Sequence, residues 1–114
     1  MTRSLPQAPR FPYRVRLRGR NVVAEDPVHP GQGVRLGFWA TCFVEAANER
    51  EAGDLAFKSL YEDQELKGAV RNDPANPPAV DVEDVLELEQ LPSNTPVGQP
   101  SYEWFDQSGP TAGY

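Results

Sequence analysis

The chain has 114 residues, a formal net charge of −6 and one cysteine. Its length fits a single domain, and its acidic balance disfavours nucleic acid as the default partner, because phosphate binding requires a compensating cationic surface. The lone cysteine excludes an intramolecular disulfide and a multi-cysteine zinc site.

Charge is distributed unevenly along the chain. Residues 1–20 hold six arginines and no acid, whereas residues 48–114 hold fourteen acids against four bases. No segment near the N-terminus resembles a secretory signal, and no apolar run approaches the roughly 20 residues needed to span a bilayer. We therefore expect a cytoplasmic protein.

The N-terminal part combines a polar arm with a strand pattern. Residues 1–10 (MTRSLPQAPR) are expected to form a flexible arm. From Phe11 to Val23, apolar and basic residues alternate, which predicts a half-buried strand with Gly19 as a position for a bulge. The apolar side holds Tyr13, Val15 and Leu17, and the basic side holds Arg14, Arg16 and Arg18.

A hairpin is expected next. Residues 25–33 (EDPVHPGQG) contain two prolines and two glycines, which predicts a loop. Residues 33–45 are the most apolar run and form the second strand, which pairs antiparallel with the first. One of its faces suits a core, with Val34, Leu36, Phe38, Ala40, Cys42 and Val44. The other face is half aromatic, with Arg35, Gly37, Trp39, Thr41 and Phe43.

A helix follows the second strand. Asn48, with Glu51 three residues later, predicts a capping box at its start. Its buried stripe at helical spacing consists of Ala52, Leu55, Ala56 and Leu60, and the helix is expected to end near residues 61–63. The next apolar residues, to Val70, either continue it or form a further turn. Three prolines in residues 71–79 exclude regular structure there.

A third strand is predicted over residues 80–89. Val80, Val82, Leu86 and Leu88 occupy one face, and Asp81, Glu83, Glu87 and Glu89 the other. Asp84 and Val85 interrupt this alternation, which a bulge or an edge position would explain. Residues 92–114 are rich in proline, glycine and small polar residues and are expected to form a tail that carries Tyr102, Trp104 and Phe105.

These elements predict one α+β domain over residues 11–91. The arrangement is a two-layer ββαβ sandwich with flexible termini, in which one helix covers one face of a three-stranded mixed sheet. A right-handed crossover through the helix makes the third strand parallel to the second. If the crossover passes over the first strand, the order is 3-1-2, and the arginine face lies beside the acidic face. Alternatively, both charged faces are simply solvated.

No complete catalytic set is present. His29, the only histidine, is expected to be solvated in a loop, with a general base or metal ligand as the alternative. Cys42 falls on the core face, where thiols are usually inert, although a pair with His29 stays open. The acids of the third strand could hold a cation, but a solvated or arginine-paired face is favoured. We therefore expect no enzymatic activity, no metal and no cofactor.

Two binding hypotheses remain. In the first, a protein-interaction or regulatory module binds a protein partner, or a second copy of itself, through the aromatic sheet face, a strand edge or the tail. In the second, the arginines around Trp39 and Phe43 hold single-stranded nucleic acid by stacking and phosphate contacts. The candidate residues are Arg14, Arg16, Arg18, Arg35, Trp39, Phe43, Tyr102, Trp104 and Phe105.

Overall fold

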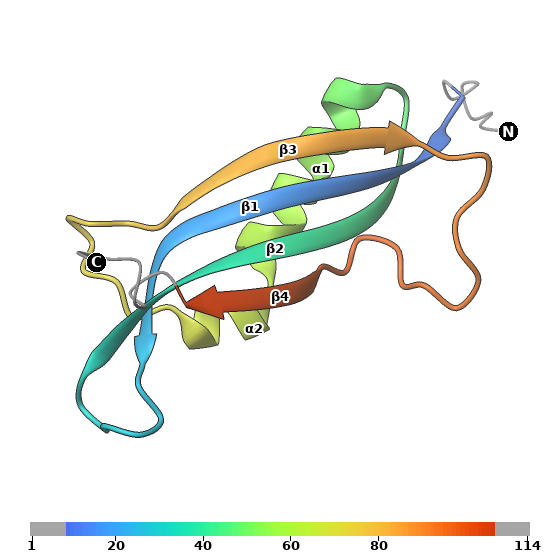
Figure 1. The fold of residues 1–114 in the computed structure, drawn as a ribbon. Coiled ribbons are helices and arrows are strands. Elements are labelled where there is room, and N and C mark those ends of the chain that lie inside the picture. The colour runs from blue at the N-terminus through green and yellow to red at the C-terminus, as the bar shows by residue number, and fades with distance from the viewer. Residues whose placement is uncertain (1–8, 107–114) are drawn as a thin grey trace, which may run out of the picture.

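The computed structural model describes residues 9–106. Four strands form one antiparallel sheet in the order β3-β1-β2-β4, and both helices cover the same face of it (Figure 1). The protein is therefore a two-layer α+β fold. Its elements are β1 (Phe11–Glu25), β2 (Gly33–Ala46), α1 (Glu49–Glu62), α2 (Gln64–Ala69), β3 (Ala79–Glu87) and β4 (Ser101–Asp106).

The predicted strand order 3-1-2 is confirmed, but the sheet is larger than expected and is not mixed. β3 runs parallel to β2, yet β1 lies between them, so every neighbouring pair is antiparallel. A fourth strand pairs with β2 and comes from the segment that was predicted to be a tail. There is also a second helix, α2. The predictions for residues 1–8 and 107–114 lie outside the described residues.

The hydrophobic core lies between the helices and the sheet. The predicted inward faces of the first two strands are confirmed, and Phe38 is completely buried. α1 closes the core with the small side chains of its inner stripe and with Leu60. Small residues there allow the helix to approach the sheet closely. The core residues are Tyr13, Val15, Leu17, Val22, Phe38, Ala40, Cys42, Val44, Ala46, Ala52, Ala56 and Leu60.

Two bulges adjust the sheet. In β1 the register shifts between Gly19 and Val22, at the predicted position, and Asn21 there has φ +58°. The second register shift lies in the β1–β3 pairing next to Arg16. It places two β3 residues opposite one residue of β1. Beyond it, Leu86 pairs with Arg14 on the reverse face. The prediction that Leu86 shares a face with Val80 is therefore wrong.

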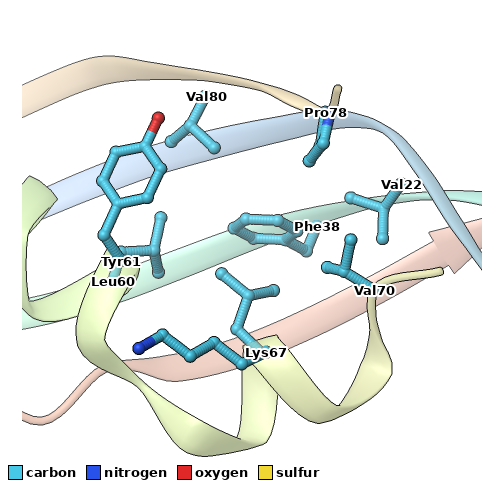
Figure 2. Close-up of a pocket in the computed structure, with 9 residues that line it drawn as sticks. Val22, Phe38, Leu60, Tyr61, Lys67, Val70, Pro78 and Val80 are labelled. Atoms are coloured by element: carbon cyan, nitrogen blue, oxygen red, sulfur yellow. The ribbon is translucent and has the colours of Figure 1, made fainter. Parts of the chain in front are cut away.

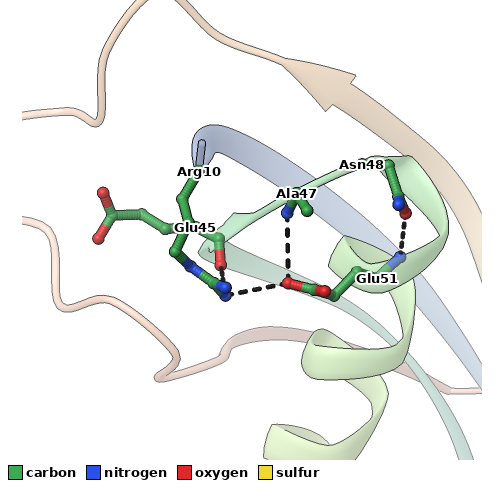
Figure 3. A network of polar contacts seen from close by, with 5 residues as sticks. All are labelled: Arg10, Glu45, Ala47, Asn48 and Glu51. Carbon is green, nitrogen blue, oxygen red and sulfur yellow. Dashed lines mark hydrogen bonds and ion pairs between the residues drawn. The ribbon is translucent and has the colours of Figure 1, made fainter. Parts of the chain in front are cut away.

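The start of α1 is fixed by a capping network (Figure 3). Oδ1 of Asn48 accepts a hydrogen bond of 2.8 Å from the Glu51 N–H, and Oε1 of Glu51 accepts one of 3.2 Å from the Ala47 N–H. The guanidinium of Arg10 lies 3.0 Å from the same Glu51 oxygen and donates to the Glu45 carbonyl at 2.7 Å. Arg10, expected to belong to a flexible arm, is thus attached to the domain.

Gly19 is a position where a side chain cannot be added without rearrangement. A Cβ at Gly19 would overlap the ring of Phe38, its direct partner on β2. We expect Gly19→Ala to lower the free energy of unfolding by about 1–3 kcal/mol, the usual cost of overpacking a core. Urea denaturation of both proteins measures it.

Gly68→Ala is the matched control for this substitution. Gly68 lies in α2, and a Cβ added there would meet no atom within 4 Å. Alanine there should stabilise the protein by about 0.5–1 kcal/mol through helix propensity. A Gly19→Ala variant as stable as the wild type would show that Phe38 does not lie against this backbone.

Neither helix in the described part of the chain is long and apolar enough to cross a membrane.

Candidate interaction face

The sheet face opposite the helices carries a row of arginines beside aromatic rings. Arg14 pairs with Phe43 and Arg18 with Trp39 across β1 and β2, because all four residues have outward parity on their strands. Phe105 of β4 joins them beside Gly37. Neither helix covers this side (Figure 1). We call this surface the arginine–aromatic face; it consists of Arg14, Arg16, Arg18, Trp39, Phe43 and Phe105.

Two guanidinium groups lie over the Trp39 ring. The Cζ atoms of Arg16 and Arg18 are 4.8 Å and 5.4 Å from the ring centroid. Contacts of this kind contribute about 0.5–1 kcal/mol each at exposed sites. Both arginines form no ion pair with a described residue, and their buried Nε atoms have no hydrogen-bond partner there. The stacking therefore holds two positive charges in fixed positions above the sheet.

The outer arginines differ because acidic residues of β3 neutralise them. Arg14 lies 3.5 Å from Asp84, and Arg20 forms an ion pair with Asp81. The expectation that β3 places acidic residues beside the arginines of β1 is thus confirmed, but the predicted acidic face is only partly right, because the bulge sets Glu87 opposite the core residue Tyr13. These pairs are exposed, so each contributes only about 0–1 kcal/mol to stability. Asp84 and Asp81 are also the register neighbours of Arg16 and Arg18, but their ion pairs are with Arg14 and Arg20.

Phe105 lies against the backbone of β2. A Cβ on Gly37 would overlap the Phe105 ring, so glycine at this position provides the space for it. Phe105 is only partly buried. β4 therefore extends the arginine–aromatic face by one ring.

The other three candidate residues lie outside this cluster. Tyr102 and Trp104 point to the helix side, where their ring centroids lie 5.4 Å and 5.2 Å from that of Phe38. Trp104 therefore does not shield Trp39, which is on the opposite side of the sheet. Arg35 has the outward parity of Trp39 on β2, but it pairs with Val23 near the hairpin end, away from the cluster, and is exposed. The structure thus brings together six of the nine predicted residues.

Tyr102 connects β4 to the junction of the two helices. Its hydroxyl donates a hydrogen bond of 2.6 Å to Asp63 Oδ2, and the same oxygen accepts one from the Leu66 N–H at the start of α2. Partial burial, and secondarily this bond to Asp63, raise the pKa of Tyr102 above its usual 10.0. A single carboxylate therefore caps α2 and anchors the last strand.

Removing the Tyr102 hydroxyl should loosen this junction. We expect Tyr102→Phe to cost about 1.5 kcal/mol, because hydrogen bonds to charged groups contribute about 1.5–3 kcal/mol and this one is only partly buried. Tyr61→Phe is the control, since that residue is 59% exposed and its loss of a hydroxyl should change stability by less than about 0.5 kcal/mol. Equal effects of the two substitutions would contradict the role of Asp63.

The raised pKa of Tyr102, caused first by burial and then by the bond to Asp63, predicts a pH dependence of stability at the alkaline end. Because the folded-state pKa of Tyr102 is raised, the protonated hydroxyl makes its full contribution to the free energy of unfolding below about pH 10, the unfolded-state pKa. This contribution is lost as the pH rises toward the folded-state pKa. Denaturation between pH 8 and pH 11 should therefore show a steeper loss of stability in the wild type than in Tyr102→Phe.

His29 and Cys42 do not form a pair. His29 is exposed in the hairpin loop, with Nδ1 3.3 Å from Asp26, whereas Cys42 is completely buried in β2. A hydrogen bond from the Val28 N–H lowers the pKa of Asp26. Within residues 9–106, no group of three or more histidine, cysteine or acidic side chains is placed to hold a metal ion.

Cys42 is expected to be unreactive in the folded protein. Burial raises the pKa of its thiol to about 11, so the thiolate is scarce at neutral pH and also inaccessible. Ellman's reagent at pH 8 should label the chain only in denaturant. Since the sequence has one cysteine, the stoichiometry must change from zero to one. Rapid labelling of the native protein would contradict this placement.

One feature that the sequence did not indicate is an apolar pocket on the helix side, next to Phe38. Its lining comes from β1, β2, α1, α2 and the start of β3, so no local motif marks it. Only the three-dimensional arrangement brings these residues together.

The fold and the face define a small two-layer α+β protein with one covered and one open sheet surface. No family model, curated protein or solved structure matches the chain. The arginine–aromatic face is therefore the feature that bears on its function.

Proposed function

We propose that the protein is a non-catalytic interaction module whose arginine–aromatic face binds an acidic surface of another protein. The observation that carries this proposal is the stacking of Arg16 and Arg18 on Trp39, at 4.8 Å and 5.4 Å, without a described carboxylate partner. Tryptophan and arginine are the residue types most enriched at the energetic centres of protein interfaces.

The stacking also prepares the arginines for binding. A guanidinium held on a ring loses less conformational entropy on binding than a free side chain, and its planar donors match a carboxylate in a bidentate geometry. The partner surface should therefore carry carboxylates that reach Arg16 and Arg18, with apolar groups that cover Phe43 and Phe105.

A different protein fits this face better than a second copy. A two-fold axis through the face would place each arginine row opposite an arginine row, because both subunits use the same patch. Arg14 and Arg20 already have carboxylate partners on β3. Glu103 of β4, the register neighbour of Trp39, is a carboxylate on this side of the sheet, but a two-fold axis would still set most of the arginine row against itself. Charge complementarity therefore favours an acidic partner of another sequence.

Charge reversal tests the proposal. The full chain with Arg16→Glu is compared with Arg50→Glu, which makes the same charge change at an exposed position in the first turn of α1. Proteins captured from the native host by the wild type and by Arg50→Glu, but lost with Arg16→Glu, would support the face. The captured partner is then titrated into the isotope-labelled chain, and the Trp39 indole signal should shift while that of Trp104 does not.

Three results would overturn the proposal. Capture that survives Arg16→Glu would place the contact elsewhere. Sedimentation showing a dimer that Arg16→Glu dissociates would make a second copy the partner. Polarisation titration with a single-stranded oligonucleotide, if it gave binding that Arg16→Glu abolishes, would favour nucleic acid. In that case the bases would have to displace the guanidinium groups that now lie over Trp39.

A further inference from the structure

The helix side of the molecule contains a pocket of about 330 Å³, within the size range of small-molecule sites. It lies where the end of α1 and the short α2 meet the sheet at the start of β3 (Figure 2). The completely buried Phe38 lies at its base, with Val70, the residue just after α2, beside it (Figure 2). The complete lining is Val22, Phe38, Leu60, Tyr61, Leu66, Lys67, Val70, Pro78 and Val80.

The polar groups of the pocket are confined to two residues. Among its nine lining residues, only Lys67 and Tyr61 have a polar side chain, and both are exposed. The Lys67 stem lies along the α2 side of the pocket (Figure 2). No described residue forms an ion pair with the Lys67 ammonium. An apolar interior is thus combined with one positive charge at its margin.

We infer that this pocket binds a small amphipathic anion, a medium-length alkyl carboxylate, with the chain along Leu66, Val70 and Val80 and the carboxylate at Lys67. Charge complementarity selects the anionic head, and the apolar lining selects the alkyl chain. A simpler role for Lys67 is that its methylenes cover apolar surface while the ammonium stays in water. The two roles differ in one measurable respect: only a site discriminates between a carboxylate and the corresponding alcohol.

This site is independent of the arginine–aromatic face. Phe38 and Trp39 are consecutive residues of β2 and therefore point to opposite sides of the sheet. A ligand beside Phe38 does not contact Arg16 or Arg18. Failure of one proposal consequently leaves the other intact.

Titration of the full chain with octanoate tests the site. We expect saturable shifts of the methyl signals of Leu66, Val70 and Val80 in NMR spectra, and intermolecular NOEs from the octanoate chain to the same methyl groups. Affinity along the series from hexanoate to octanoate should rise by about fourfold per methylene, the effect of burying one such group. A flat series would show that the chain is not buried and would overturn the proposal.

Two lysine variants define the head group. Lys67→Gln should weaken octanoate binding by about tenfold, the order expected for loss of a charge-assisted hydrogen bond, and leave octanol binding unchanged. Lys58→Gln is the matched control, because Lys58 lies on α1 outside the pocket and pairs with Glu62 at 3.9 Å. Equal weakening by the two variants, or no discrimination between octanoate and octanol, would overturn the assignment. Chemical-shift changes confined to methyl groups outside the pocket would also overturn the assignment.

Discussion

Phe38→Ala is expected to lower the free energy of unfolding by about 3–5 kcal/mol, the range measured for removal of a buried aromatic ring. Phe38 is completely buried and is one of the largest side chains of the core. Its ring covers Gly19 on one strand and contacts Tyr102 on another. Because domains are stable by only about 5–15 kcal/mol, this single change should leave a marginal fold.

Phe43→Ala is the control for this prediction. Phe43 lies on the same strand but on the reverse face and is only partly buried. Its loss should cost less than about 2 kcal/mol, because the area returned to water is smaller. Urea denaturation followed by far-ultraviolet circular dichroism gives both values. If Phe43→Ala were the more damaging change, the assignment of the two sheet faces would be reversed.

Trp39→Ala is expected to reduce partner binding by at least about 30-fold, which corresponds to the 2 kcal/mol that defines an interface hot spot. The loss has two sources, since the substitution removes the ring and also releases Arg16 and Arg18 from their fixed positions. Stability should fall by only about 1–2 kcal/mol, the sum of two exposed cation–π contacts. Titration calorimetry with the captured partner measures the binding term.

Trp104→Ala separates a general effect of tryptophan loss from an effect of the face. Trp104 is 36% exposed and lies on the helix side beside Phe38. Binding of the partner should therefore stay within about twofold of the wild type, a difference of about 0.4 kcal/mol. The reverse pattern, with Trp104→Ala weakening binding and Trp39→Ala silent, would move the contact surface to the other side of the sheet.

The central hairpin and α1 could be predicted because their signals are local. Alternation over two long strands marks the two faces, and Asn48 with Glu51 marks the start of the helix. The position of β3 beside β1 was predictable from charge, because the acidic residues of β3 can pair with the arginines of β1. Most of the candidate face was predictable from strand alternation, because Arg16, Arg18 and Trp39 all have outward parity on their strands.

The remaining features depend on contacts that are distant in sequence. β4 is six residues long and lies in a proline-rich stretch, so its composition resembles a linker. Once this segment is known to be a strand, parity separates Trp104 from Phe105. The β3 bulge places Leu86 on the opposite face of the sheet from the one predicted. No residue type in this strand marks the inserted position. The pocket is formed by five elements and has no sequence signature.

The acidic edge of the sheet has a consequence for self-association. β3 is an outer strand, and its bulge and exposed Asp81, Glu83 and Asp84 interrupt the flat ladder that another copy would need for pairing. The outer edge of β3 is therefore protected against pairing with another copy both by its bulge and by its charged side chains.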